Sequence, residues 1–201
     1  VLAAQHSEAA TVLIERSAEV GAKVYREGVE FGLLQRTPGV GGQLVRLDTA
    51  GGPVDDVLLP LFGAHMARNA ALAVAAVEAF LGGKPLAPDI ITEALGQVQA
   101  PARLEVVRRS PTVVLDTCHN PHGARATIDA LTEAFTFAPL IGVVAMMADK
   151  DVDGLLSIFA EEMTTIVCTT VAGTSRASSP DALAERAPGI FGEDRVRVAS
   201  G

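Results

Sequence analysis

Apolar and polar positions follow two different patterns along the first part of this 201-residue chain. Residues 8–20 carry apolar side chains at helical spacing with charges between them, which predicts an amphipathic helix. The pattern then changes to short β-prone runs separated by glycine-rich segments, which predicts a small antiparallel meander. The strands expected in it are residues 23–26, 31–35, 44–47 and 54–59. The glycines within residues 39–42 follow no buried strand and precede no helix, so they indicate a hairpin turn rather than a phosphate-binding loop.

A strongly apolar helix is expected after this meander. Residues 66–81 are apolar on nearly every face, which is typical of a helix that is buried all round. Its polar exceptions, His65 and Asn69, are four residues apart and share one face. Asn69 offers the donor and acceptor needed to read the edge of an adenine. The simpler interpretation, which the sequence by itself favours, is a buried amide that pairs with neighbouring backbone.

The second half of the chain repeats a strand-and-helix pattern. A short helix over residues 88–98 is followed by a proline-containing stretch, which places the expected domain boundary between residues 99 and 100. Beyond it, a short strand at residues 103–107 precedes four apolar strands, expected at residues 112–116, 140–146, 165–170 and 195–199. Helices are expected between them at residues 123–135, 152–162 and 180–187. Repeated β-α-β units with near-continuous apolar strands predict a parallel sheet that is covered on both faces.

Three polar loops leave the carboxyl ends of these strands, where parallel sheets bind their ligands. They span residues 117–122, 147–151 and 171–179. In the first of them, a strand expected to be buried ends at Asp116, and His119 and Asn120 follow before the next helix. These three side chains are candidate ligand contacts. A turn in which the Asp and the Asn only cap backbone amides is an equally weighted alternative.

Composition excludes several classes of protein. With 49% hydrophobic residues the chain is not a disordered one, and a net charge of −8 without a basic run argues against a nucleic-acid scaffold. No signal peptide is visible, and the most apolar helix carries charged residues, so it does not predict a membrane span. Cys118 and Cys168 suggest no disulfide framework, which favours a reducing cytoplasm. A start at Val1 and an end at Gly201, directly after an expected strand, suggest a piece of a longer protein.

Five motifs in this order resemble those of the Mur ligase superfamily, and more closely those of its bacterial folylpolyglutamate synthase and dihydrofolate synthase branch. They are Leu59-Pro60-Leu61-Phe62-Gly63-Ala64-His65 with Asn69-Ala70-Ala71, Pro101-Ala102-Arg103-Leu104-Glu105, Asp116-Thr117-Cys118-His119-Asn120-Pro121, Met147-Ala148-Asp149-Lys150-Asp151 and Ser175-Arg176-Ala177. The resemblance covers essentially the whole chain. It implies an α/β fold: the end of a Mur-ligase-type central ATPase domain (residues 1–99), then a Rossmann-like C-terminal glutamate ligase domain (residues 100–201) with a mostly parallel sheet, truncated at both ends.

The resemblance implies an ATP-dependent amide ligase. ATP phosphorylates a carboxylate of folate or dihydropteroate, the amine of L-glutamate attacks the acyl phosphate, and phosphate leaves. The implied protein is a cytoplasmic monomer that binds neither nucleic acid nor membrane. ATP and Mg²⁺ are the implied cofactors. The sequence contains no Gly-x-x-x-x-Gly-Lys-Ser/Thr loop, so that loop and the magnesium ligands are expected upstream of this chain, which we do not expect to turn over ATP by itself.

The resemblance also assigns roles to residues of this chain, none of them as a metal ligand. The implied nucleotide-binding residues are His65, Asn69 for the adenine, Arg103 for the phosphates, and Asp116, His119 and Asn120 near the ribose. The implied catalytic residues are His119, Lys150 and Arg176, the last two toward the phosphate or the glutamate carboxylate. Four positions depart from the usual motifs, Met66, Ala102, Cys118 and Ser175, and none of these changes removes a charged group.

Competing interpretations are weaker on the same residues. A redox Rossmann enzyme needs a glycine-rich turn directly after a strand, and none of the four candidate strands has one. A zinc site at Cys118, His119 and His122 lacks a second cluster of ligands. Two alternatives stay open: a peptidoglycan-type Mur amide ligase, and a non-catalytic nucleotide-binding module.

Overall fold

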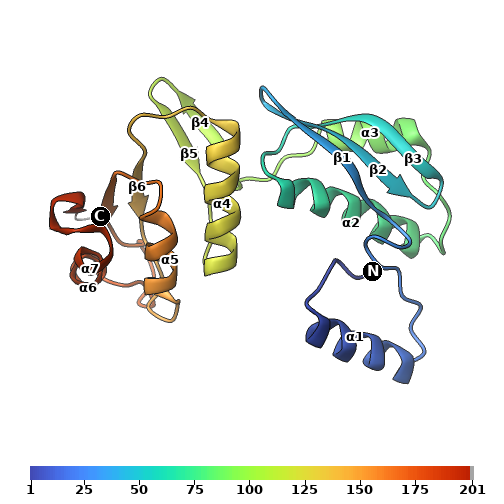
Figure 1. The fold of residues 1–201 in the computed structure, drawn as a ribbon, viewed down its shortest axis with the longest axis horizontal. Helices are drawn as coiled ribbons and strands as arrows, with labels where there is room; N and C mark the ends of the chain where they lie inside the picture. The colour runs from blue at the N-terminus through green and yellow to red at the C-terminus, as the bar shows by residue number, and fades with distance from the viewer. Residues whose placement is uncertain (200–201) are drawn as a thin grey trace. The chain divides into compact units, whose positions relative to one another are not determined.

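The computed structural model describes residues 1–199 and divides the chain into two compact units, Val1–Arg103 and Leu104–Gly201. The boundary expected from the sequence lies between residues 99 and 100, and the last two residues of the chain lie outside the described part. The two units are treated separately below, and both are drawn in Figure 1.

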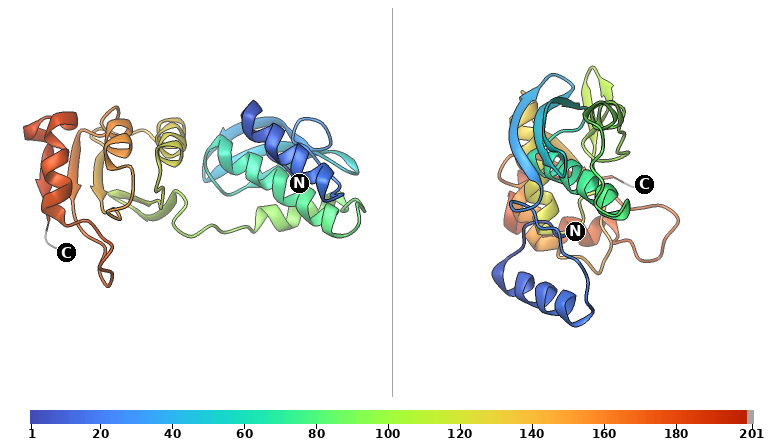
Figure 2. Two further views of the ribbon diagram at one scale, coloured as in Figure 1. Left: turned by 90° about the horizontal axis from the view of Figure 1, so that it is seen from below. Right: turned by 90° about the vertical axis from the view of Figure 1, so that its right-hand side faces the viewer.

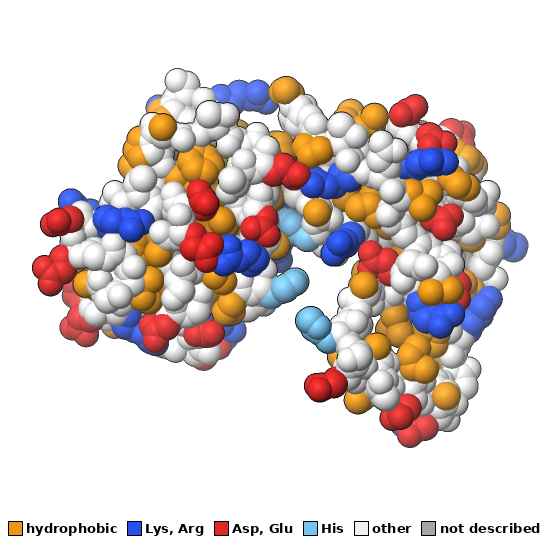
Figure 3. Space-filling view, viewed as in Figure 1, with side chains coloured by type: hydrophobic (Ala, Val, Ile, Leu, Met, Phe, Trp, Pro, Cys, Tyr) orange, Lys and Arg blue, Asp and Glu red, His pale blue; other side chains and the backbone are white. Residues whose placement is uncertain are grey.

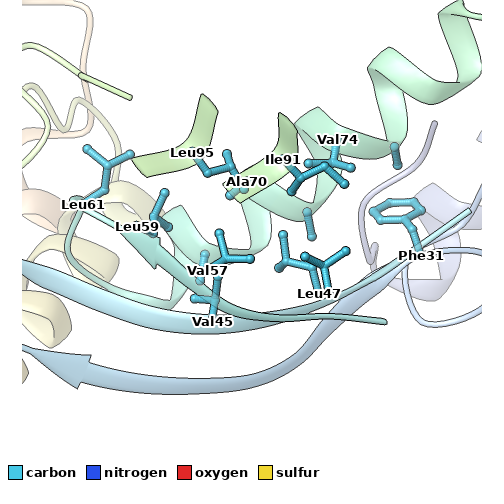
Figure 4. Close-up of a cluster of buried hydrophobic side chains, with 14 residues drawn as sticks. Phe31, Val45, Leu47, Val57, Leu59, Leu61, Ala70, Val74, Ile91 and Leu95 are labelled. Carbon is cyan, nitrogen blue, oxygen red and sulfur yellow. The ribbon is translucent and has the colours of Figure 1, made fainter. Parts of the chain in front are cut away.

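The first unit is a three-stranded antiparallel sheet covered by helices. Its strands pair in the order β1-β2-β3. Helix α2 packs against β1 and β2, and α3 packs against β3. The elements are α1 (Ser7–Glu19), β1 (Gly32–Gly39), β2 (Gly42–Thr49), β3 (Gly52–Leu59), α2 (Ala64–Phe80) and α3 (Pro88–Gly96). The core lies between the sheet and these two helices, as Figure 4 shows for residues from Phe31 to Leu95.

The predicted meander and its hairpin turn are confirmed, because Gly39 pairs with Gly42 at the β1–β2 turn. The strand predicted at residues 23–26 is wrong. This segment makes only an isolated bridge, between Leu2 and Arg26. The Arg26 amide instead donates to the Glu30 carboxylate at 2.6 Å, so a nearby side chain occupies a donor that a strand would need.

Helix α2 is not buried all round, contrary to the prediction. Its buried residues are Ala67, Ala70, Ala71, Val74, Ala75 and Glu78. Their spacing of three and four residues marks a single face, and Phe80 on another face is 90% exposed. An alanine-rich helix reads as apolar in every direction, but only the side that meets the sheet is packed.

The second unit contains two separate sheets. Strands β4 (Glu105–Arg109) and β5 (Thr112–Leu115) form an antiparallel hairpin, whereas β6 (Ile141–Val144), β7 (Thr165–Cys168) and β8 (Val196–Val198) form a parallel sheet in that order. The helices are α4 (Pro121–Ala134), α5 (Val152–Phe159), α6 (Pro180–Arg186) and α7 (Pro188–Phe191), and a 3₁₀ turn spans Glu193–Arg195. Helices α4 and α5 lie side by side (Figures 1 and 2).

The parallel sheet is confirmed, but the prediction that the strand at residues 112–116 belongs to it is wrong. Only Ser110 and Pro111 connect β4 to β5, and so short a link makes the two strands pair with each other. The same strand is not buried, since Val113 and Leu115 are exposed. The apolar run at residues 112–116 therefore predicted a strand correctly, but it did not predict that this strand pairs with β4.

One buried carboxylate holds two loops of the first unit. Glu78 on α2 is 3% exposed, and its two oxygens accept hydrogen bonds from the amides of Ala50 and Leu86, each at 3.0 Å. Ala50 follows β2 and Leu86 precedes α3, so this side chain ties both connections to the helix.

We expect Glu78→Ala to destabilise the first unit by about 1–3 kcal/mol, because two amides lose a charged acceptor and the side chain leaves a cavity. Urea unfolding followed by circular dichroism measures the change. Glu19→Ala is the matched control, since that exposed glutamate only pairs with Arg16 on the surface and should contribute little. An equal shift in both variants would contradict this role for Glu78.

Candidate functional site

Two of the three candidate residues of the first unit lie at the start of α2. His65 is half-buried and Asn69 is exposed. The Nδ2 atom of the Asn69 side chain lies 4.0 Å from the sulfur of Met66. The interpretation of Asn69 as a buried amide paired with backbone is therefore wrong. The sulfur is a weak acceptor, so this contact ties the exposed amide only weakly.

Arg103, the last residue of the first unit, lies in an unusual stretch of backbone. Its neighbours Ala102 and Leu104 have φ values of 55° and 49°, a region that residues with a Cβ rarely adopt. The exposed side chain of Arg103 follows a turn in which its amide donates to the carbonyl of Ala100 at 3.1 Å. Two left-handed residues thus set the direction in which this arginine leaves the chain.

Asp116 is the most heavily bonded candidate residue of the second unit. Its Oδ1 accepts from the Cys118 amide at 2.8 Å and from the Thr127 hydroxyl at 3.0 Å. Its Oδ2 accepts from the amide of Leu104 at 3.0 Å. The aspartate does cap backbone amides, and its role as a ligand contact stays a prediction. The carboxylate joins the residue before β4, the following loop and α4.

The rest of this loop is also ordered by polar contacts. Asn120 caps α4, since its Oδ1 accepts from the Gly123 amide at 2.7 Å. His119 is exposed, and its Nδ1 lies 3.2 Å from the carbonyl of Thr117. Because Nδ1 is the nitrogen near that carbonyl, the Nε2 side of the ring is the one directed away from the loop.

Two further loops of the second unit meet each other. Residues Met147 and Ala177 form an antiparallel bridge, and the Ala148 amide donates to the carbonyl of Arg176 at 2.9 Å. This pairing brings together two segments that the sequence separates by more than twenty residues. Lys150 and Arg176, one from each loop, consequently lie beside the same carboxylate.

That carboxylate belongs to Asp149. Its Oδ2 lies 3.1 Å from Lys150 Nζ, and its Oδ1 accepts from Arg176 Nη2 at 3.0 Å. The hydrogen bond from Lys150, and then that from Arg176, lower the pKa of Asp149. Two cations around one carboxylate leave a local positive charge, which suits an anionic group of a ligand.

The loop that contains His119 lies beside the start of α5. Asp151 caps α5 by accepting from the Gly154 amide at 3.0 Å. A Cβ placed on Gly154 would lie 2.4 Å from Asp151 Oδ2 and 2.9 Å from Pro121 Cγ, so glycine is required for this close packing. The Asp116–Pro121 motif and the Asp149–Asp151 motif are thus neighbours in space.

Surface charges outside this cluster are mixed. Figure 3 shows acidic and basic side chains interspersed over each unit on the face in view. Within residues 1–199, no group of three or more His, Cys, Asp or Glu side chains is arranged to hold a metal ion. In the same part of the chain, no helix has the length and apolar character needed to cross a membrane.

Sequence reasoning missed two polar residues that organise these sites, Thr127 beneath Asp116 and Gln43 beneath the start of α2. Both are buried, at 7% and 2% exposure. The only signal for Thr127 is that a hydroxyl on the apolar face of a predicted helix needs a partner. No periodicity marks Gln43, because its partners are main-chain carbonyls distant in sequence.

Comparison with known proteins gives a consistent result. Residues 102–200 match the family model of the Mur ligase, glutamate ligase domain. The dihydrofolate synthase/folylpolyglutamate synthase of Mycobacterium tuberculosis is 42% identical over 202 residues, which cover 99% of this chain and 41% of that protein. The chain therefore spans about two fifths of the length of this curated relative.

Two solved structures support the similarity. The crystal structure of Mycobacterium tuberculosis folylpolyglutamate synthase complexed with ADP and AMPPCP matches with a TM-score of 0.94 and 42% identity, over 98% of this chain and 44% of that one. An FPGS-AMPPCP-folate complex matches with a TM-score of 0.77 and 27% identity, over 99% of this chain and 48% of that one.

The thiol of Cys118 gives a test of the loop geometry. Burial, and then the charge of Asp116, raise its pKa to about 11, and burial raises the pKa of Cys168. At pH 8 only about a thousandth of the Cys118 thiol is then ionised. We expect iodoacetamide to alkylate Cys118 many-fold more slowly in the folded chain than in the chain unfolded in urea. Mass spectrometry measures the rate of alkylation. Rapid labelling of Cys118 in the folded chain would contradict this environment.

Proposed function

We propose that the complete protein, of which residues 102–200 match the Mur ligase, glutamate ligase domain, is an ATP-dependent amide ligase that adds glutamate to a folate. The observation that carries the proposal is the 42% identity to a dihydrofolate synthase/folylpolyglutamate synthase over 99% of this chain. In the proposed reaction, ATP phosphorylates the folate carboxylate, the glutamate amine replaces phosphate, and ADP and phosphate are released. Phosphorylation supplies a leaving group, while the protein positions the reactants and neutralises charge.

We propose that the first unit is the end of the central ATP-binding domain and supplies contacts to the nucleotide. Asn69 is suited to an adenine edge because its exposed amide offers both a donor and an acceptor. His65 lies one helical turn before it on the same face of α2. Arg103, at the end of this unit, would contact the phosphates.

The second unit would act on the glutamate ligase side. Asp116 uses both oxygens for internal hydrogen bonds, and a carboxylate with about four acceptor directions keeps capacity for a ribose hydroxyl. His119 and Asn120 lie on the loop that Asp116 shapes. Lys150 and Arg176, already held by Asp149, would bind the transferred phosphate or the glutamate carboxylate.

Magnesium, which such a reaction requires to neutralise phosphate charge, is not assigned to this chain. The described residues offer no fitting group of carboxylates or histidines. We propose that its ligands lie in the part of the protein outside this sequence. The same holds for the phosphate-binding loop, which the sequence lacks. We further propose that the protein is a cytoplasmic monomer.

The proposal predicts glutamate-dependent ADP release by the complete protein with a reduced folate or dihydropteroate as acceptor. The assay couples ADP to NADH oxidation and omits glutamate as the blank. Turnover only with a UDP-sugar peptide acceptor would instead identify a peptidoglycan-type ligase, and ATP binding without turnover would identify a nucleotide-binding module. We expect the 201-residue chain by itself to release no ADP, because it contains no phosphate loop.

A second prediction concerns Arg176. We expect Arg176→Ala in the complete protein to raise the KM for glutamate about ten- to a hundredfold, because a bidentate charged contact is lost. Arg186→Ala is the matched control, since Arg186 pairs with Asp153 in a surface ion pair of the same kind. The role fails if both variants have the same KM for glutamate. A higher KM for ATP alone would move Arg176 to the phosphate side.

A further inference from the structure

Gln43 is the most buried polar side chain of the first unit, at 2% exposure. Its Nε2 donates two hydrogen bonds, to the carbonyl of Leu61 at 2.8 Å and to that of Gly63 at 3.0 Å. Its Oε1 accepts from Arg36 Nη1 at 3.1 Å. Both N–H groups and the carbonyl of one amide are thus engaged, each with a different partner.

The two carbonyls that Gln43 binds belong to the connection between β3 and α2. Gly63 is the N-cap residue of α2, with a φ of 87°, and no side chain caps this helix. The carbonyl of Gly63 also accepts the amides of Met66 at 3.2 Å and Ala67 at 3.4 Å. Gln43 is therefore bonded directly to Gly63, the residue from which α2 begins.

The residue before Gln43 brings the same connection close to β2. A Cβ on Gly42 would lie 2.3 Å from the carbonyl oxygen of Leu59 and 2.8 Å from Cα of Pro60. Only glycine permits this approach, and its φ of 155° adds a conformation that other residues rarely adopt. Gly42 and Gln43 together fix the backbone from the end of β3 to the start of α2.

We propose that Gln43 is a positioning residue for nucleotide binding. Gln43 fixes the first turn of α2, which carries His65 and leads to Asn69. The inference rests on the proposed function, because that proposal assigns these two side chains to the nucleotide. The hydrogen-bond partners of Gln43 require an amide at this position. A glutamate would face two carbonyls with a carboxylate, and an apolar residue would leave both carbonyls and the Arg36 guanidinium without this partner.

The test compares Gln43→Met with wild type in the complete protein. Methionine keeps the volume of the side chain and removes all three hydrogen bonds. We expect the Kd for ATP by calorimetry and the KM for ATP to rise about tenfold, because the first turn of α2 loses its hydrogen bond from Gln43 and the nucleotide contacts on it are no longer fixed; this change corresponds to roughly 1.4 kcal/mol of binding free energy. The KM for glutamate and kcat should stay within about twofold.

Thr49→Val is the control for a merely structural effect. Thr49 is a buried polar residue at the other end of β2, and its hydroxyl donates to the carbonyl of Gly52 at 2.7 Å. Its loss should lower stability without changing the KM for ATP. If Gln43→Met fails to fold, Gln43→Asn retains an amide that is too short to reach both carbonyls and should show the same selective rise.

The outcomes separate the two proposals. Unchanged ATP binding in a folded Gln43 variant, or a fall in kcat alone in proportion to lost folded protein, would overturn the positioning role. Weakened ATP binding together with no folate-dependent turnover by wild type would support the positioning role and overturn the ligase. A wild-type protein that does not bind ATP would overturn both.

Discussion

The carboxylate of Asp116 is the contact on which the candidate site of the second unit depends. It accepts hydrogen bonds from the residue before β4, from its own loop and from the side of α4, and so joins three segments at one point. Capping and ligand binding were alternative interpretations of this residue in the sequence. They are compatible, because a carboxylate that first orders its own loop presents His119 in one arrangement and retains an acceptor direction.

The same physical device recurs at three of the segments that carry candidate residues. Polar side chains satisfy main-chain groups at the starts of three helices: Gln43 at α2, Asn120 at α4 and Asp151 at α5. Loops cannot be fixed by apolar packing alone, since their amides and carbonyls need partners. The positions of the site residues are therefore set by hydrogen bonds to the backbone, while the apolar core sets the positions of the helices and sheets beneath them.

The sequence predicts features that depend on local patterns better than features that depend on distant partners. Helical spacing and glycine turns are local signals, so α1, α3 and the β1–β2 hairpin were predictable. Strand partners are not local, and the apolar run of β5 did not show that β4 would pair with it. From the resemblance, the motifs predicted that Asp116, His119 and Lys150 contact the ligands, and this stays a prediction. They could not identify Gln43, whose role depends on carbonyls eighteen and twenty residues away.

The two amides of the first unit show how burial decides what a polar side chain can do. Asn69 was expected to be buried and therefore occupied by backbone, and this expectation made its ligand role the weaker one. The structure reverses the assignment: Gln43 is buried and fully engaged with main-chain groups, and Asn69 is exposed beside a weak sulfur acceptor. A buried amide that lost its partners would cost free energy, so Gln43 must hold the helix start at all times. An exposed amide exchanges its partners with water at little cost, and exposure therefore favours Asn69 over Gln43 for the adenine contact that we propose.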